Sequence, residues 1–210
     1  MRNSLIKVLF LTFFFNLCFA APIKITFWHS MAGALGVTVD QLAEEFNHSQ
    51  TTYEIVPVFK GNYPETLTAV VAAFRAKQQP DIVQIFEVGT AMMTNPPGVV
   101  VPVYKLMQQA GLDLNANEFL PAIASYYSDS QGNLLALPFN SSTPILFYNK
   151  TAFKKAGLDP NIPPSTWPEL AADSKQLLAH GYNCGFTTGW PSWIQLEAFS
   201  AWHNIPLWYG

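Results

Sequence analysis

The chain has 210 residues, half of them hydrophobic, and a formal net charge of −3 at pH 7. Its 11 basic against 14 acidic side chains argue against nucleic acid as a partner, because binding to phosphate backbones needs a basic surface. It has two cysteines, and cleavage after residue 20 would leave only Cys184, so burial rather than an internal disulfide must stabilise the fold.

The first 20 residues have the features of a secretory signal peptide. Arg2 and Lys7 give a positive start, and residues 8–19 form an apolar run. Cys18 and Ala20 place small residues at the two positions where signal peptidase needs them for a cut after Ala20. We therefore expect the chain to be exported and cleaved.

A membrane anchor is the alternative interpretation of this apolar run. The run is shorter than the roughly 20 residues that a spanning helix needs, and Pro22 and Lys24 follow it directly. A lipid anchor on Cys18 would want small residues just before it, where Asn16 and Leu17 stand. The sequence thus favours a cleaved, soluble form.

The first portion of the mature chain alternates between strand and helix patterns. Leu35, Val39 and Phe46 recur at helical spacing, and Asn62 with Pro64 marks the start of a second helix. The expected strands cover 23–27, 53–59 and 81–86, and the expected helices cover 35–46 and 66–76. This order of elements argues for an open α/β sheet.

In the second portion, the predicted elements are interrupted more often by turns. After a Pro- and Gly-rich turn at 95–98, the sequence predicts further elements. The expected helices cover 103–109, 119–126, 151–156 and 167–180, and the expected strands cover 134–137, 145–148 and 184–187. Asn149 is placed to cap the helix at 151–156 and Gly157 to end it.

The polar loop between Pro138 and Pro144 connects the two α/β portions. The two prolines keep its amide and hydroxyl side chains on an extended backbone that cannot become helical, and Ser142 lies in this loop. Ligands in α/β sheets bind beyond the carboxyl ends of strands, where Tyr63 and Glu87 follow predicted strands. We expect these residues to converge on one cleft that suits a hydroxyl-rich ligand.

Five ordered segments carry a resemblance to a known family. They are TFWHSMAG at 26–33, KGNYPETL at 60–67, FEVGTAMM at 86–93, PFNSSTPILFYNKTAFKKAGLDP at 138–160 and GWPSWIQLEAFSAWH at 189–203. Together they closely resemble the periplasmic sn-glycerol-3-phosphate-binding proteins of bacterial ABC importers, within extracellular solute-binding protein family 1. The resemblance runs from about residue 25 to residue 203.

The resemblance implies a periplasmic-binding-protein-like α/β fold, with two α/β lobes that close around a hinge and are incomplete here. We expect a signal peptide at 1–20, the first part of the N-terminal lobe at 21–138 and the start of a second lobe at 139–210. The implied ligand is sn-glycerol 3-phosphate or a related glycerophosphodiester. The implied protein partners are the membrane permease subunits of the importer, in the periplasm.

The resemblance also implies ligand-binding roles for four residues. Tyr63 and Glu87 would hydrogen-bond the ligand, Glu87 by accepting from glycerol hydroxyls. Ser142 would donate from the hinge side. Trp167 would lay its indole ring against the carbon backbone of glycerol.

Each of these residues also has a purely structural interpretation. Trp167 stands at a helix start, where it could be a capping or core aromatic. Glu87 could be a solvated loop carboxylate, Tyr63 could pack on Pro64, and Ser142 could cap a turn. Their joint fit to one cleft favours the functional interpretation.

Catalytic and metal-binding patterns are missing from the sequence. The chain has no Gly-rich phosphate loop or nucleophile elbow, and no carboxylates paired across a scissile bond. The histidines are scattered without metal spacing, at His29, His48, His180 and His203. We expect a binding protein, without cofactor, metal or enzymatic activity.

The predicted site lacks an obvious partner for phosphate, because its segments contain no arginine. Members of the family are about twice as long, and the resemblance implies that their later portion supplies further contacts, including an arginine. We therefore expect a chain truncated at its C-terminus, with exposed sheet edge and apolar surface. Our hypothesis is that it does not bind glycerol 3-phosphate with useful affinity by itself.

Two other functions stay open at this point. A binding protein for a neutral sugar would use the same aromatic and hydroxyl contacts and would need no phosphate-binding group. A secreted hydrolase or lectin-like domain is the alternative hypothesis from a different functional class.

Overall fold

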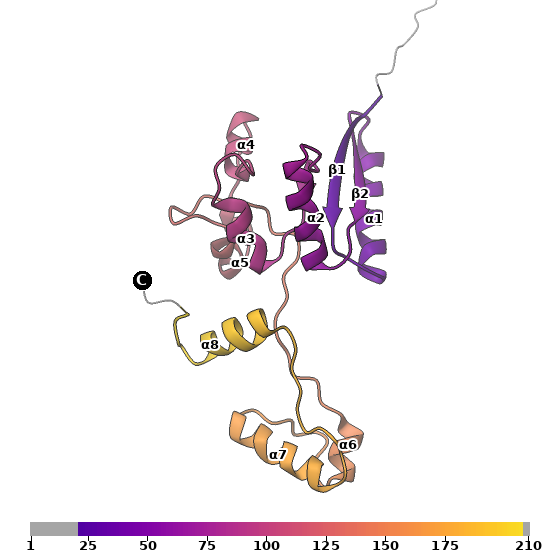
Figure 1. The fold of residues 1–210 in the computed structure, drawn as a ribbon, viewed down its shortest axis with the longest axis vertical. Coiled ribbons are helices and arrows are strands. Elements are labelled where there is room, and N and C mark those ends of the chain that lie inside the picture. Colours follow the sequence, from indigo (N-terminus) through magenta and orange to yellow (C-terminus); the bar gives the residue numbers. More distant parts are fainter. Residues whose placement is uncertain (1–20, 208–210) are drawn as a thin grey trace, which may run out of the picture. The chain divides into compact units, whose positions relative to one another are not determined.

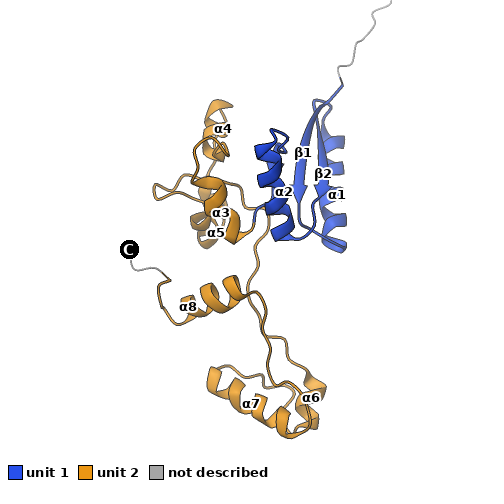
Figure 2. Cartoon of the chain, in the orientation of Figure 1, with its two compact units in different colours: residues 1–85 blue, residues 86–210 orange. Residues whose placement is uncertain are grey.

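The computed structural model describes residues 21–207 and divides the chain into two compact units, one ending at Ile85 and the other starting at Phe86 (Figure 2). The predicted signal peptide, residues 1–20, lies outside the described residues. The predicted lobe boundary between residues 138 and 139 falls inside the second unit and stays a prediction. Within residues 21–207, no helix is both long and apolar enough to cross a bilayer.

The first unit is built around a parallel sheet of three strands in the order β2-β1-β3 (Figure 1). β1 (Ile23–His29) pairs with β2 (Tyr53–Phe59) along its whole length, with Ile23 opposite Tyr53 and His29 opposite Phe59. β3 (Ile82–Val83) pairs with the other side of β1. The predicted bounds of β2 are confirmed, and β1 runs two residues beyond the prediction.

β3 is shorter than the strand predicted at 81–86. The backbone N–H of Gln84 still donates to the carbonyl oxygen of Trp28, at 2.8 Å, but the side chain of Gln84 accepts from the backbone N–H of Ser30, at 2.9 Å. The chain then leaves the sheet and a helix begins at Glu87. The prediction of a longer strand was wrong, because the apolar run continues past the last residues that pair with β1.

Two helices connect the strands of this unit. α1 (Ala34–Ser49) links β1 to β2, and α2 (Tyr63–Arg75) links β2 to β3. The two connections run in opposite directions across the sheet, and right-handed crossovers therefore place the helices on opposite faces, as Figure 1 shows. The predicted β-α-β-α-β order is confirmed.

A capping box fixes the start of α2. The side chain of Asn62 accepts from the backbone N–H of Glu65 at 3.0 Å, and the Glu65 carboxylate accepts from the backbone N–H of Asn62 at 2.7 Å. This reciprocal pair satisfies two donors at the helix terminus. The helix begins at Tyr63, three residues earlier than the predicted bound, and the predicted start near Asn62 is confirmed.

The interior of the first unit combines side chains from both helices and the central strand. The buried residues include His29 and Met31, Val39 and Ala43 of α1, and Thr66 and Val70 of α2. Leu35 and Leu42 belong to the apolar pattern that predicted α1, yet they are 62% and 54% exposed. Only part of the apolar surface of α1 is therefore covered within the described residues.

The second unit is formed by short helices joined by long irregular segments (Figure 1). The helices are α3 (Glu87–Thr94), α4 (Val103–Gln109), α5 (Pro121–Tyr126), α6 (Lys150–Lys155), α7 (Trp167–Ala179) and α8 (Phe199–Trp202), with a 3₁₀-helix η1 (Ala116–Glu118) and a π-helix η2 (Pro191–Ala198). The predicted helices at 103–109, 151–156 and 167–180 are confirmed within one residue at each end. The helix predicted from residue 119 begins at Pro121, and α3, η2 and α8 were not predicted.

The three strands predicted in this unit were wrong. Leu134 forms only an isolated antiparallel bridge with Ser128, and residues 145–148 and 184–187 are irregular. A strand is stable only when a neighbouring strand pairs its backbone groups. Within the described residues no such neighbour lies beside these segments, and Phe147 is 85% exposed.

A small core joins α6 and α7. Ala152, Phe153 and Ala156 of α6 are buried together with Leu177 of α7. The side chain of Asn149 accepts from the backbone N–H of Ala152 at 3.0 Å and so caps α6, as predicted. Gly157, with φ +75°, follows its C-terminus in the left-handed conformation that glycine adopts most easily.

Candidate ligand-binding site

Tyr63 stands at the carboxyl end of the sheet, as predicted. It is the first residue of α2, four residues after the end of β2, and its side chain is half-buried. Gly61 in the connecting loop has φ +91°, and a Cβ there would collide with the Glu65 carboxylate of the capping box. The KGNY sequence thus supplies a glycine where the turn requires one, and places Tyr63 at the helix start.

Three polar side chains that the sequence did not single out meet at the same end of the sheet. The hydroxyl of Ser30 donates to Thr66 Oγ1 at 2.7 Å, and Gln84 Oε1 accepts from the backbone N–H of Ser30 at 2.9 Å. Ser30 follows β1 and Gln84 follows β3, and these two strands are neighbours in the sheet. Open α/β sheets bind ligands beyond the carboxyl ends of their strands. The strand patterns at 23–27 and 81–86 predict the strands but not these bonds.

His29 is the last residue of β1 and directly precedes Ser30 of this polar cluster. It is 2% exposed, its ring lies near Phe27 and Phe59, and Nδ1 accepts from the backbone N–H of Met31 at 3.3 Å. Burial lowers the pKa of His29, and the charge of Asp40 acts in the opposite direction. The neutral ring therefore serves as a structural acceptor, within a segment that carries the family resemblance.

Glu87 opens α3 in the second unit. Its Oε1 atom is buried and has no hydrogen-bond partner among the described residues. Such an acceptor suits a ligand that donates, because an unsatisfied buried carboxylate oxygen is costly. Burial and the negative charge of Glu87 raise the pKa of Glu197, a residue of η2. Glu87 is thus a half-buried carboxylate rather than a solvated loop group.

The π-helix η2 is a feature that the sequence did not indicate. It follows Trp190, whose φ of +52° is unusual for a bulky residue, and it carries Glu197. π-helical turns are rare and frequently lie at functional sites. No sequence pattern separates them from α-helices, so the residue pattern of 190–198 could not reveal this one.

Ser142 lies in the irregular segment between Pro138 and Pro144, and its side chain is exposed. The predicted absence of helix in this loop is confirmed. The hydroxyl is accessible, as a ligand donor would have to be.

Trp167 is the first residue of α7 and lies within an aromatic cluster. Thr166 and Glu169 form a second capping box at this helix start. The cluster consists of Trp167, Phe186, Phe199, Trp202 and His203, with ring centroids 4.8–6.4 Å from that of Trp167. The indole N–H of Trp167 donates to His203 Nε2 at 3.1 Å, and the residue remains 38% exposed. The neighbouring rings therefore cover much of the Trp167 indole, and part of the indole stays accessible.

The four predicted residues are divided between the two units. Tyr63 belongs to the first unit, and Glu87, Ser142 and Trp167 belong to three separate segments of the second. Their convergence on one cleft stays a prediction. Among the described residues no group of three or more His, Cys, Asp or Glu side chains is arranged to hold a metal ion.

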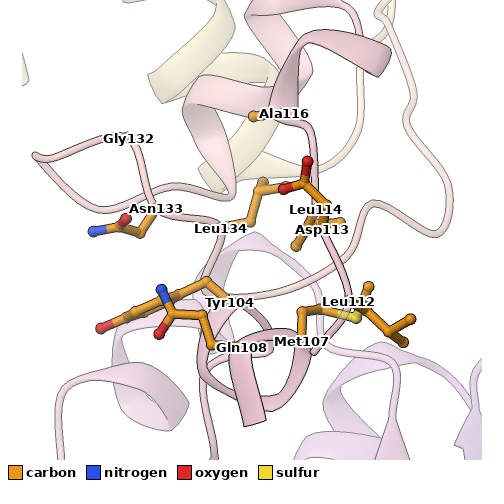
Figure 3. Close-up of a pocket in the computed structure, with 10 residues that line it drawn as sticks. All are labelled: Tyr104, Met107, Gln108, Leu112, Asp113, Leu114, Ala116, Gly132, Asn133 and Leu134. Atoms are coloured by element: carbon orange, nitrogen blue, oxygen red, sulfur yellow. The ribbon is translucent and has the colours of Figure 1, made fainter. Parts of the chain in front are cut away.

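A separate pocket lies in the second unit, between α4 and the segments 112–116 and 132–134 (Figure 3). Its volume is about 160 Å³, and it combines apolar side chains such as Met107 and Leu134 with the polar ends of Tyr104 and Asn133. None of the four predicted site residues lines it. It is therefore not the predicted ligand site.

Curated relatives match almost the whole chain. Proteins named sn-glycerol-3-phosphate-binding periplasmic protein UgpB are 52% identical in Yersinia pestis and 50% identical in Brucella abortus, over 210 and 187 residues. The alignments cover 98% and 89% of this chain, and 48% and 43% of those proteins. The chain thus spans about half the length of the curated relatives it matches.

Solved structures with the same fold include two solute-binding proteins. The cyclic alpha-maltosyl-1,6-maltose binding protein of Arthrobacter globiformis has a TM-score of 0.58 at 24% identity, covering 77% of this chain and 39% of that one. A periplasmic solute binding protein of Pectobacterium atrosepticum has a TM-score of 0.59 at 23% identity, with coverages of 77% and 37%. These likenesses concern the fold alone, and they confirm the predicted periplasmic-binding-protein-like α/β class.

The family profile described as bacterial extracellular solute-binding protein matches residues 32–209. This range includes four of the five segments in full and most of the described structure. The chain therefore belongs to the bacterial extracellular solute-binding protein family.

Proposed function

We propose that this chain provides part of a periplasmic solute-binding protein that captures sn-glycerol 3-phosphate, or a related glycerophosphodiester, for an ABC importer. The observation that carries the proposal is the 52% identity to a protein named for that ligand, across 98% of the chain. In this proposal the protein binds and releases its ligand unchanged, and hands it to membrane permease subunits.

Within this proposal, Glu87 and Ser142 recognise the glycerol hydroxyls. The buried Oε1 of Glu87 lacks a partner among the described residues and accepts from a hydroxyl, while the exposed Ser142 donates. Tyr63, at the carboxyl end of the sheet, contributes a further hydrogen bond. Trp167 offers the accessible part of its indole to the carbon backbone of glycerol.

The phosphate group has no evident partner in this set. Arg75 is the one arginine among residues 21–207, and it lies in the last turn of α2. A helix rises about 1.5 Å per residue, so Arg75 stands about 18 Å along the axis from Tyr63. We therefore expect the chain by itself to bind glycerol 3-phosphate more weakly than micromolar, and calorimetric titration of residues 21–210 checks this.

The function itself is tested in a chimaera. Residues 25–203 of this chain replace the matching residues of the Yersinia pestis relative, and calorimetry measures the binding of glycerol 3-phosphate. The proposal expects a dissociation constant within about tenfold of the parent, a difference of at most about 1.4 kcal/mol. A folded chimaera that does not bind would overturn the proposal.

A neutral sugar is the second candidate ligand, favoured by the distance between Arg75 and Tyr63. Maltose and glycerol 3-phosphate are compared in a thermal-shift assay on the same chimaera. Stabilisation by glycerol 3-phosphate alone supports the first proposal, and stabilisation by maltose alone supports the second.

A further inference from the structure

His203 is placed to control the orientation of the Trp167 indole. The two residues are 36 positions apart in the sequence, and the indole N–H donates to His203 Nε2 at 3.1 Å. Trp167 begins α7, and His203 caps the C-terminus of α8. The bond therefore joins two helices of the second unit.

The other neighbours of the indole cannot supply this bond. Phe199 and Trp202 pack against the ring with centroid distances of 4.8 and 6.2 Å, but neither side chain carries an acceptor. The His203 ring lies nearly parallel to the indole, at an interplanar angle of 26°. Packing limits where the indole can lie, and a directional hydrogen bond also fixes which edge it turns toward His203.

The hydrogen bond determines which ring nitrogen of His203 carries the proton. Indole Nε1–H is a donor only, so Nε2 of His203 must be the unprotonated ring nitrogen and Nδ1 must carry the proton. A side chain with an acceptor at a similar reach, such as glutamine, can preserve the bond. A phenyl ring preserves the stacking and loses the acceptor.

The geometry points to His203 as a positioning residue, which holds the Trp167 indole in the orientation that its accessible part presents to a ligand. The positioning itself is a property of the pair, and its use for a ligand rests on the proposed function. Sequence patterns give no sign of this role, because the two residues lie on different helices.

The test follows the indole N–H signals of the tryptophans by nitrogen-15 NMR in the 210-residue chain. Trp167→Phe identifies the signal of Trp167. In His203→Phe we expect this signal to move more than that of any other indole, and its hydrogen exchange to become severalfold faster. His203→Gln keeps both near the wild-type values. His180→Phe, at the other end of α7, is the matched control.

Addition of glycerol 3-phosphate at millimolar concentration to the same variants of the chimaera that carries residues 25–203 separates the two claims. A ligand-induced shift of the Trp167 signal that weakens severalfold in His203→Phe, but not in His203→Gln, supports positioning for the ligand. An indole signal that His203→Phe leaves unmoved overturns the inference, as does unchanged ligand affinity in that variant. No effect of a bound ligand on the Trp167 signal of the unsubstituted chimaera, with the His203→Phe shift present, contradicts only the proposed role of Trp167 in ligand binding.

Discussion

Within the described residues, the two units differ in how completely their strand-like segments are paired and their helices are packed. In the first unit, β1 pairs with strands on both sides and helices cover both faces. In the second, segments with strand-like sequences have no partner, and the helices rest on small local contacts such as the α6–α7 core. The comparison shows that a strand-like sequence pattern indicates only a tendency to form a strand. A strand forms where a neighbouring strand pairs with its backbone groups.

The largest effect is expected from a substitution in the α6–α7 core, which should destabilise that core and leave the sheet of the first unit unchanged. Phe153→Ala removes a ring that is 4% exposed, and such truncations cost about 3–5 kcal/mol. Hydrogen exchange followed by mass spectrometry should show faster exchange in α6 and α7, with β1 and β2 unchanged. Equal acceleration in both units would contradict their independence.

Among residues 21–207 each unit has one capping box, so the effect of losing it can be compared between the units. Asn62→Ala at α2 and Thr166→Ala at α7 should each cost about 1 kcal/mol, since each leaves a helix-terminal N–H without its acceptor. Local exchange rates report the loss. We expect the effect of Asn62→Ala to spread to β1 and β2, and that of Thr166→Ala to stay within the second unit.

The first unit should also lose stability on mild acidification. Burial lowers the pKa of His29 below the 6.5 of an unperturbed histidine, so the unfolded chain takes up the proton first. Stability is fully present above the unfolded pKa, and is lost as the pH falls from there through the folded pKa. Exchange of β1 amides should therefore accelerate between pH 7 and 5, after correction for intrinsic rates.

Two variants decide whether His29 is the cause. His29→Gln should remove the part of the pH dependence that lies near this window, whereas His48→Gln, at an exposed position of α1, should retain it. A pH dependence that survives His29→Gln unchanged would assign it to other groups.

The smallest effect is expected at the exposed strand-like segment. Phe147 is 85% exposed, so Phe147→Ser should change the free energy of unfolding by less than about 0.5 kcal/mol. Chemical denaturation measures this change. A loss comparable to that of Phe153→Ala would mean that residues 145–148 pair with a strand after all.

The fold was predictable where the signals are local and their partners lie nearby. The strand predicted at 53–59 has the bounds of β2, and Asn62 and Asn149 marked helix starts through short-range caps. The strand predicted at 145–148 failed because pairing depends on residues far away in the sequence. The apolar run 81–86 likewise could not show where Gln84 turns from the ladder to Ser30.

For the candidate site, the sequence predicted where a residue stands relative to the strands, but not the contacts that its side chain makes. The rule for α/β sheets placed Tyr63 at the carboxyl end of β2, and the structure agrees. The buried oxygen of Glu87, the Ser30–Thr66–Gln84 bonds and the contact of Trp167 with His203 depend on three-dimensional packing. No spacing in the sequence encodes them.

The most direct measurement compares Glu87→Gln with Glu45→Gln in the chimaera that carries residues 25–203. Glu45 is an exposed residue of α1 and serves as the matched control. If Glu87 accepts from the glycerol hydroxyls, Glu87→Gln weakens calorimetric binding of glycerol 3-phosphate about tenfold or more, since hydrogen bonds to charged groups contribute about 1.5–3 kcal/mol. Equal affinity in the two variants would contradict the proposed recognition of the ligand by this chain.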